Sequence, residues 1–135
     1  MDSSKANEQN YWTLYNLAIT QLGRMLMKKK NQFDKMLIKS IDEAIKEIFG
    51  ETGARIIYDY LQHNHSLNRE EIPERLKDFE RGLEKILGSG AWVMERTALN
   101  NLYLNFGLEY RNKENYSFAN HIGTLKNRKR EEAET

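Results

Sequence analysis

Apolar residues recur at spacings of three and four along most of this chain, which is the period of an amphipathic α-helix. The breaks in that pattern fall mainly at glycines, and Pro73 is the single proline. Because proline is the residue that most strongly interrupts a helix, the chain is free to be helical almost throughout. No stretch alternates cleanly between apolar and polar residues, so a β-sheet is disfavoured. We therefore expect an all-α fold.

The apolar pattern and its interruptions divide the chain into five to six helices. They are expected over residues 10–30, 32–49, 54–62, 73–87, 91–106 and 118–129. Ser117 precedes the last helix as its predicted N-cap, and residues 63–66 have the composition of a turn. A single domain is expected over residues 1–135, in which residues 1–8 and 130–135 are predicted to be disordered tails.

The sequence leaves open whether residues 10–49 form one helix or two. Three lysines, Lys28 to Lys30, interrupt the apolar stripe, and Asn31 is a plausible N-cap for a second helix. These features favour a break near residue 30. The alternative is one long helix, since no proline lies within this segment.

Two stretches share one pattern: two apolar residues, a glycine, a short polar step and then Gly-Ala. They are residues 48–54 and residues 86–91. A glycine accepts the positive φ that ends a helix, and Gly-Ala lets the next helix begin close against the first. We expect a compact bundle with two Gly-cornered helical hairpins. Either the two corners are independent of each other, or they belong to the two copies of a duplicated helical hairpin.

Composition limits the class of protein. The net charge is only +1, from 21 basic and 20 acidic residues, so global steering towards nucleic acid is weak. The absence of cysteine excludes thiol catalysis and thiolate metal sites, and it fits a reducing compartment. The polar N-terminus lacks the apolar core of a signal peptide, and no long apolar run predicts a membrane span. We expect a cytoplasmic protein with no membrane partner.

Candidate catalytic and metal-binding residues are few. His63 and His65 lie two apart, and His121 would be a distant third metal ligand, so exposed turn histidines are the favoured interpretation. Neighbouring carboxylates such as Glu70 and Glu71 lie in polar stretches typical of a solvated helix face. Neither glycine corner carries the Gly-Lys-Ser/Thr of a phosphate-binding loop. We expect no catalytic residue, no metal and no cofactor; an enzyme would instead require a deep cleft with convergent polar groups.

The segment over residues 10–30 is apolar over more of its circumference than a solvent-exposed helix needs. Either this helix crosses the core or it packs against a second copy of itself. Its candidate interface residues are Tyr11, Trp12, Tyr15, Ile19 and Leu22. Farther along the chain, Trp92 is expected either in the core or in the wall of an apolar pocket that accepts a small effector.

Two basic patches support a second interpretation. They consist of Arg24, Lys28, Lys29 and Lys30, and of Lys126, Arg128, Lys129 and Arg130. Each patch can contact a phosphate backbone with salt-dependent, weakly specific affinity. The competing explanation is solubility together with favourable charges at helix ends. Acidic residues directly follow the second patch and dilute its charge.

Several short motifs between residues 33 and 118 share their order and spacing with one known family. They are Phe49-Gly50-x-x-Gly53-Ala54-x-x-Ile57-Tyr58, Leu67-x-x-Glu70-Glu71-Ile72-Pro73, Phe79-x-x-Gly82-Leu83-Glu84-x-Ile86-Leu87-Gly88-x-Gly90-Ala91, Leu102-Tyr103 and Phe106-Gly107-Leu108. Over this segment the chain resembles a family of small archaeal domains of unknown activity, the Nitrosopumilus-type output domains. The resemblance implies a helical regulatory or output role with no known reaction, and it is compatible with a dimer. The N-terminal helix and the basic C-terminal patch lie outside it.

These observations lead to a functional hypothesis. The chain is expected to be a non-enzymatic regulatory or signal-output module that acts through protein contacts, with itself as a homodimer or with another protein. The alternative is a small nucleic-acid-binding regulator, such as a regulator of transcription, that contacts nucleic acid through the patches at residues 24–30 and 126–130.

Overall fold

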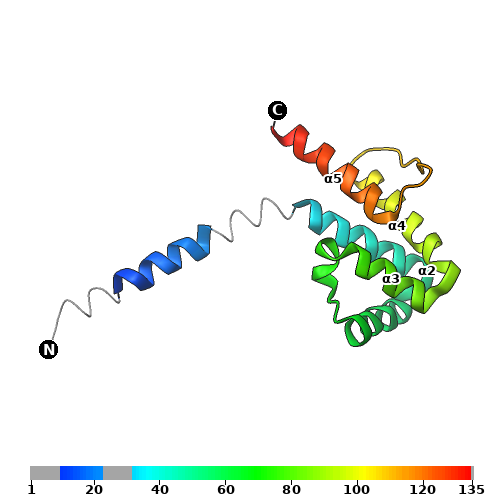
Figure 1. Cartoon of the computed structure of the whole chain (residues 1–135), viewed down its shortest axis with the longest axis horizontal. Helices are drawn as coiled ribbons and strands as arrows, with labels where there is room; N and C mark the ends of the chain where they lie inside the picture. The colour runs from blue at the N-terminus through cyan, green and yellow to red at the C-terminus, as the bar shows by residue number, and fades with distance from the viewer. Residues whose placement is uncertain (1–9, 23–31, 135) are drawn as a thin grey trace. The chain divides into compact units, whose positions relative to one another are not determined.

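A computed structural model describes residues 10–22 and 32–134 of the chain, and these residues form five α-helices and no strand (Figure 1). The prediction of an all-α fold is confirmed. After the helix over residues 10–22, the elements are α2 (Gln32–His65), the 3₁₀ turn η1 (Arg69–Glu74), α3 (Leu76–Leu87), the 3₁₀ turn η2 (Gly88–Gly90), α4 (Ala91–Asn105) and α5 (Phe118–Glu134). No helix in this part of the chain is long and apolar enough to cross a membrane.

The chain divides into two units, with the boundary between Gln32 and Phe33. Two expectations from the sequence lie outside the described residues: the disordered tail over residues 1–8, and the break near residue 30 that decides between one helix and two over residues 10–49. Both stay predictions.

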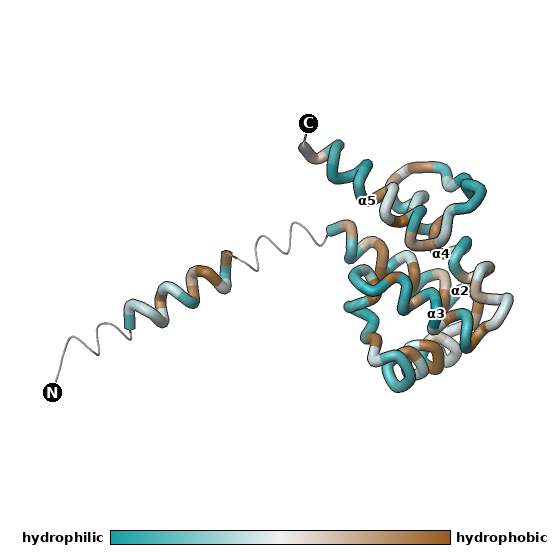
Figure 2. The backbone as a smooth tube through the Cα atoms, in the orientation of Figure 1, coloured by the Kyte–Doolittle hydropathy of each residue, from teal (hydrophilic) through white to brown (hydrophobic). Residues whose placement is uncertain are grey.

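The hydrophobic core of the second unit draws on all four of its helices. Along α2 to α5, apolar residues alternate with polar ones in the way that amphipathic helices require (Figure 2). The largest fully buried side chains are Leu37, Ile41, Ile45, Leu61, Leu67, Ile72, Phe79, Leu83, Met94, Leu102, Ile122 and Leu125. The Phe33 and Phe106 rings stack at 5.5 Å between centroids, which joins the start of α2 to the end of α4.

The two predicted glycine corners are present. Gly50 has a φ of 75° and Gly88 a φ of 57°, values that a residue with a Cβ rarely adopts. At Gly50 the backbone leaves the helical conformation, so α2 consists of two helices that meet there, as the sequence predicted. The second helix begins immediately after Gly50, without the short loop that was expected between the two. A hydrogen bond spans this kink in α2. The Tyr58 hydroxyl, which follows Gly50 in the chain, donates to the Asp42 carboxylate, which precedes it, at 3.0 Å.

The turn predicted over residues 63–66 begins later than expected, because α2 continues to His65. The Asn64 amide donates back to the Tyr60 carbonyl at 3.0 Å, and a His63 ring nitrogen lies 2.8 Å from the Asp59 carbonyl. These polar side chains therefore bond to the preceding helical turn and do not end the helix. The chain reverses at Ser66, whose φ is 48°.

Two other boundaries differ from the prediction. Pro73 lies inside η1, and α3 begins three residues later at Leu76. The predicted disordered tail from residue 130 is helical, since α5 continues to Glu134. Arg128 and Lys129 pair with Glu132 at 3.5 Å and 3.1 Å, and such pairs one turn apart stabilise the end of a helix.

The start of α5 is fixed from two sides. The Asn120 backbone N–H donates to the Ser117 hydroxyl at 3.1 Å, while the Ser117 N–H donates to the Asn120 side-chain oxygen at 3.0 Å. The predicted cap at Ser117 is confirmed, and its bonds are reciprocal. From α3, the Glu80 carboxylate accepts a 3.0 Å hydrogen bond from the Ala119 N–H. The first turn of α5 is therefore held against α3.

Candidate functional site

A cleft of about 500 Å³ lies where α3, η2, α4 and α5 meet the irregular segment over residues 108–117, which we call the arm. Its volume is within the range of small-molecule sites. The side chains that decide its chemistry are Glu80, Glu84, Trp92, Glu95, Arg96 and His121, together with Tyr110 and Tyr116 of the arm.

Three carboxyl groups line this cleft. Glu80 and Glu84 are four residues apart on α3 and so project from the same helix face, and Glu95 faces them from α4. Burial, reinforced by the charges of Glu80 and Glu84, raises the pKa of the Glu95 carboxyl to about 7. Near neutral pH this carboxyl can therefore hold or release a proton.

Trp92 forms part of the cleft wall. Its side chain is 54% exposed, which places it outside the core and supports the second of the two positions expected for it. One turn later on α4, the Arg96 guanidinium lies over the indole ring, 5.2 Å from the ring centroid. The aromatic face is thus occupied by a positive charge that belongs to the chain itself.

His121 fixes the arm to α5. The side chain is 2% exposed, and its ring lies 5.3 Å from the Tyr110 ring and 5.2 Å from the Tyr116 ring, between centroids. Its Nε2 atom is 3.3 Å from the Asn112 side-chain oxygen. Burial, together with the charge of Lys113, lowers the pKa of the imidazole, so His121 is neutral at neutral pH.

A carboxyl with a near-neutral pKa and a neutral imidazole, here in the lining of one cleft, are groups that general acid–base catalysis uses. A nucleophile is the further requirement of covalent catalysis. The Ser117 hydroxyl at the rim is engaged in capping α5, so it is not presented to a substrate.

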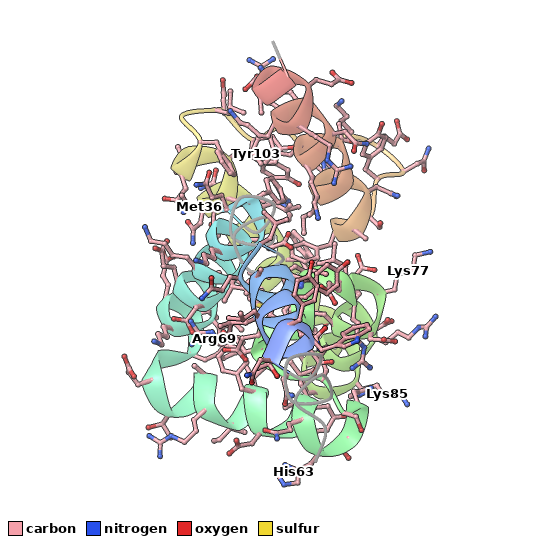
Figure 3. The ribbon with its side chains drawn as sticks, turned by 90° about the vertical axis from the view of Figure 1, so that its left-hand side faces the viewer. Met36, His63, Arg69, Lys77, Lys85 and Tyr103 are labelled. Carbon is pink, nitrogen blue, oxygen red and sulfur yellow. The ribbon has the colours of Figure 1, made fainter. Side chains whose placement is uncertain are left out.

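The histidines considered as metal ligands do not come together. His63 extends outward at the end of α2 (Figure 3), whereas His121 lines the cleft. Within residues 10–22 and 32–134, no three His, Asp or Glu side chains are placed to hold a metal ion. The Glu71 carboxylate accepts a 3.1 Å hydrogen bond from the Asn68 N–H and caps η1.

The candidate partner interface lies on the helix over residues 10–22. The large apolar side chains of this helix are exposed, from 50% at Ile19 to 75% at Tyr11. The Trp12 and Tyr15 rings meet edge to face at 5.9 Å between centroids. No charged residue lies between positions 10 and 22. The helix therefore has one aromatic and aliphatic face, and uncharged polar residues lie on its opposite face.

The proposed nucleic-acid patches divide between described and undescribed parts of the chain. Arg24, Lys28, Lys29 and Lys30 lie outside the described residues. In the second patch Lys126 pairs with Asp34 at 3.3 Å, and Arg128 and Lys129 pair with Glu132, which neutralises part of the positive charge. Arg130 is exposed. Nucleic-acid binding by these residues stays a prediction.

Sequence reasoning missed the cleft carboxylates, although one signal was present. Glu80 with Glu84, and Trp92 with Arg96, are spaced by one helical turn and so each pair shares a face. The sequence could not indicate that the two faces oppose each other across α3 and α4.

Comparison with known proteins gives no match: no family model, curated protein or solved structure is significantly similar to this chain. The resemblance to the Nitrosopumilus-type output domains therefore stays a prediction. The function has to be inferred from the chain's own residues and their geometry.

Proposed function

We propose that this chain is a non-enzymatic regulatory or signal-output module that acts through protein contacts and forms a homodimer through the helix over residues 10–22. The observation that carries the proposal is the apolar face that this helix exposes when it is considered by itself, a face that holds no charge. Exposed apolar patches on proteins mark surfaces that bind a partner.

The spacing of the apolar residues favours a second helix as the occupant. Trp12, Tyr15, Ile19 and Leu22 follow one another at intervals of three, four and three. This is the spacing of the a and d positions that form the seam of a coiled coil. Two copies of the helix can therefore bury the same stripe against each other.

Charges in the flanking sequence favour an antiparallel pair. Glu8 precedes the helix in sequence and Arg24 follows it. Antiparallel packing brings the acidic end of each copy to the basic end of the other, whereas parallel packing juxtaposes like charges.

The energetics predict a dimer that depends on concentration. Burial of one large apolar side chain contributes about 1.5–3 kcal/mol, and partial burial proportionately less. Association costs about 4–15 kcal/mol in lost translational and rotational freedom. In a short seam with few large apolar side chains per copy, the free energy gained by burial exceeds the cost of association by only a small margin. Single substitutions in the seam are therefore expected to abolish the dimer.

The test is light scattering of the purified full chain over a range of concentrations. We expect the wild-type mass to rise from monomer to dimer, and Ile19→Asp or Trp12→Ala to give a monomer. Thr20→Asp is the matched control, because it adds the same charge to the opposite face of the same helix. A chain that is monomeric throughout, or a dimer that tolerates Ile19→Asp, contradicts the proposal. Adding mixed DNA to the same samples tests the nucleic-acid alternative.

A further inference from the structure

The cleft between α3, α4 and the arm has an uneven charge. Glu80, Glu84 and Glu95 supply three carboxyl groups, and Arg96 supplies the one permanently positive group in the cleft lining. His121 adds no positive charge near neutral pH, because burial and Lys113 lower its pKa. The lining therefore carries a negative excess that a cationic guest would neutralise, and ionisation of Glu95 increases this excess.

The walls of the same cleft are aromatic. Trp92 comes from α4, Tyr110 and Tyr116 come from the arm, and Phe118 comes from α5. Aromatic faces attract cations, and tryptophan is the strongest of them. The Arg96 guanidinium already occupies the Trp92 face at 5.2 Å, so the structure itself shows a cation seated there. Arg96 is an exposed residue and can leave this position without disturbing the core.

We propose that this cleft binds a small organic cation, namely a protonated amine attached to an apolar or aromatic body. The ammonium group pairs with the Glu95 carboxylate, and the nearby charges of Glu80 and Glu84 add to the attraction. The apolar body packs on Trp92, and Arg96 is displaced from the indole face. Arg96 therefore acts as an internal competitor for the ligand.

The size of the cleft distinguishes this ligand from a protein partner. A cleft of about 500 Å³ is that of a small-molecule site. A stable protein interface instead covers about 800 Å² on each partner. The proposal is independent of the dimer, because it uses no residue of the helix over residues 10–22.

The geometry also predicts how binding depends on pH. Glu95 shares the cleft lining with Glu80 and Glu84 of α3, Arg96 of its own helix, His121 of α5, and Tyr110 and Tyr116 of the arm. The Lys113 ammonium lies beside this lining, 5.3 Å from the Tyr116 ring centroid. Its pKa of about 7 means that it loses its proton as the pH rises through neutrality, while a simple amine remains protonated. Protonation of His121 at acid pH adds repulsion in the same direction. Affinity is therefore expected to increase from acid to alkaline pH.

The experiment is isothermal titration calorimetry of the full chain with phenethylamine, and with 2-phenylethanol as a neutral probe of the same shape. We expect a dissociation constant on the order of 1 mM or tighter for the amine, and affinity about tenfold weaker for the alcohol. Glu95→Gln should weaken amine binding about tenfold and flatten its pH profile, because glutamine mimics the protonated acid. Arg96→Gln should tighten it several-fold, because the competing cation is gone.

Glu47→Gln is the control, because Glu47 is exposed on α2 and is not part of the cleft lining. It should leave binding unchanged. Equal affinity for the amine and the alcohol would show an apolar pocket without charge selection. Each of three results overturns the proposal: equal affinity for the two probes, undetectable binding of the amine, or weaker binding of the amine by Arg96→Gln than by the wild type. Circular dichroism of each variant verifies that the helices are intact.

Discussion

The guanidinium of Arg75 donates a 3.0 Å hydrogen bond to the backbone carbonyl of His65, the last residue of α2. The same guanidinium donates to the Ser66 carbonyl at 2.7 Å and to the Asp78 carboxylate at 2.9 Å. The last carbonyls of a helix have no partner within the helix, so Arg75 satisfies them from the start of α3. One side chain therefore joins the end of α2 to the beginning of α3.

Replacing Arg75 with methionine is expected to destabilise the fold. Methionine retains much of the apolar stem but none of the donors, and a hydrogen bond to a charged group contributes about 1.5–3 kcal/mol. We expect a loss of about 2 kcal/mol in the free energy of unfolding, measured by urea denaturation. Arg81→Met is the matched control, because Arg81 is largely exposed and makes one ion pair of 3.7 Å. Equal stability of the two variants would contradict the capping role.

Gly82 allows α3 to approach the second half of α2. A Cβ built on Gly82 meets the buried Leu61 side chain and comes within 3.3 Å of the His65 ring. Gly82→Ala is therefore expected to lower the thermal midpoint, although alanine favours a helix over glycine by about 1 kcal/mol. Gly123→Ala, in the middle of α5 with open space around its Cβ, should raise the midpoint instead. A rise in both variants would mean that the close approach is not required.

The Tyr58 hydroxyl braces the kink in α2 through Asp42, which also pairs with Lys46 at 2.9 Å and Arg69 at 3.6 Å. Tyr58→Phe removes the hydrogen bond and keeps the ring, so we expect a loss of about 1 kcal/mol in the free energy of unfolding. Tyr60→Phe is the control, because no hydrogen bond of the Tyr60 hydroxyl contributes to this brace. Chemical denaturation of the three proteins gives the comparison; an unchanged midpoint in Tyr58→Phe would exclude a stabilising brace.

Local features of this fold were predictable, and long-range ones were not. The glycine at position 50 and the cap at Ser117 act on adjacent backbone, so their effect can be read from a few residues. The extension of α5 was missed because a charged tail resembles a disordered one until its charges are paired, as Arg128 is with Glu132. The cleft was missed because its chemistry arises only when Glu95 packs opposite α3.

Glu95 should make the stability of the protein depend on pH in a direction opposite to that of most carboxyl groups. Its pKa is raised by burial and by Glu80 and Glu84 from an ordinary value of 4.5 to about 7 in the folded chain. The folded state therefore binds a proton more tightly than the unfolded state does. The resulting stabilisation is fully present below the unfolded pKa and is lost as the pH rises through the folded pKa.

Comparison of the wild type with Glu95→Gln isolates this contribution, because glutamine stays neutral at every pH. We expect the free energy of unfolding of the wild type to fall relative to that of Glu95→Gln between about pH 5 and about pH 8, measured by urea denaturation at a series of pH values. His121, whose pKa is lowered by burial and Lys113, acts in the opposite direction and is common to both proteins, so it largely cancels from the difference. A difference that is constant across this range would mean that Glu95 titrates as an ordinary surface carboxyl, with the cleft open enough for water to solvate its charge.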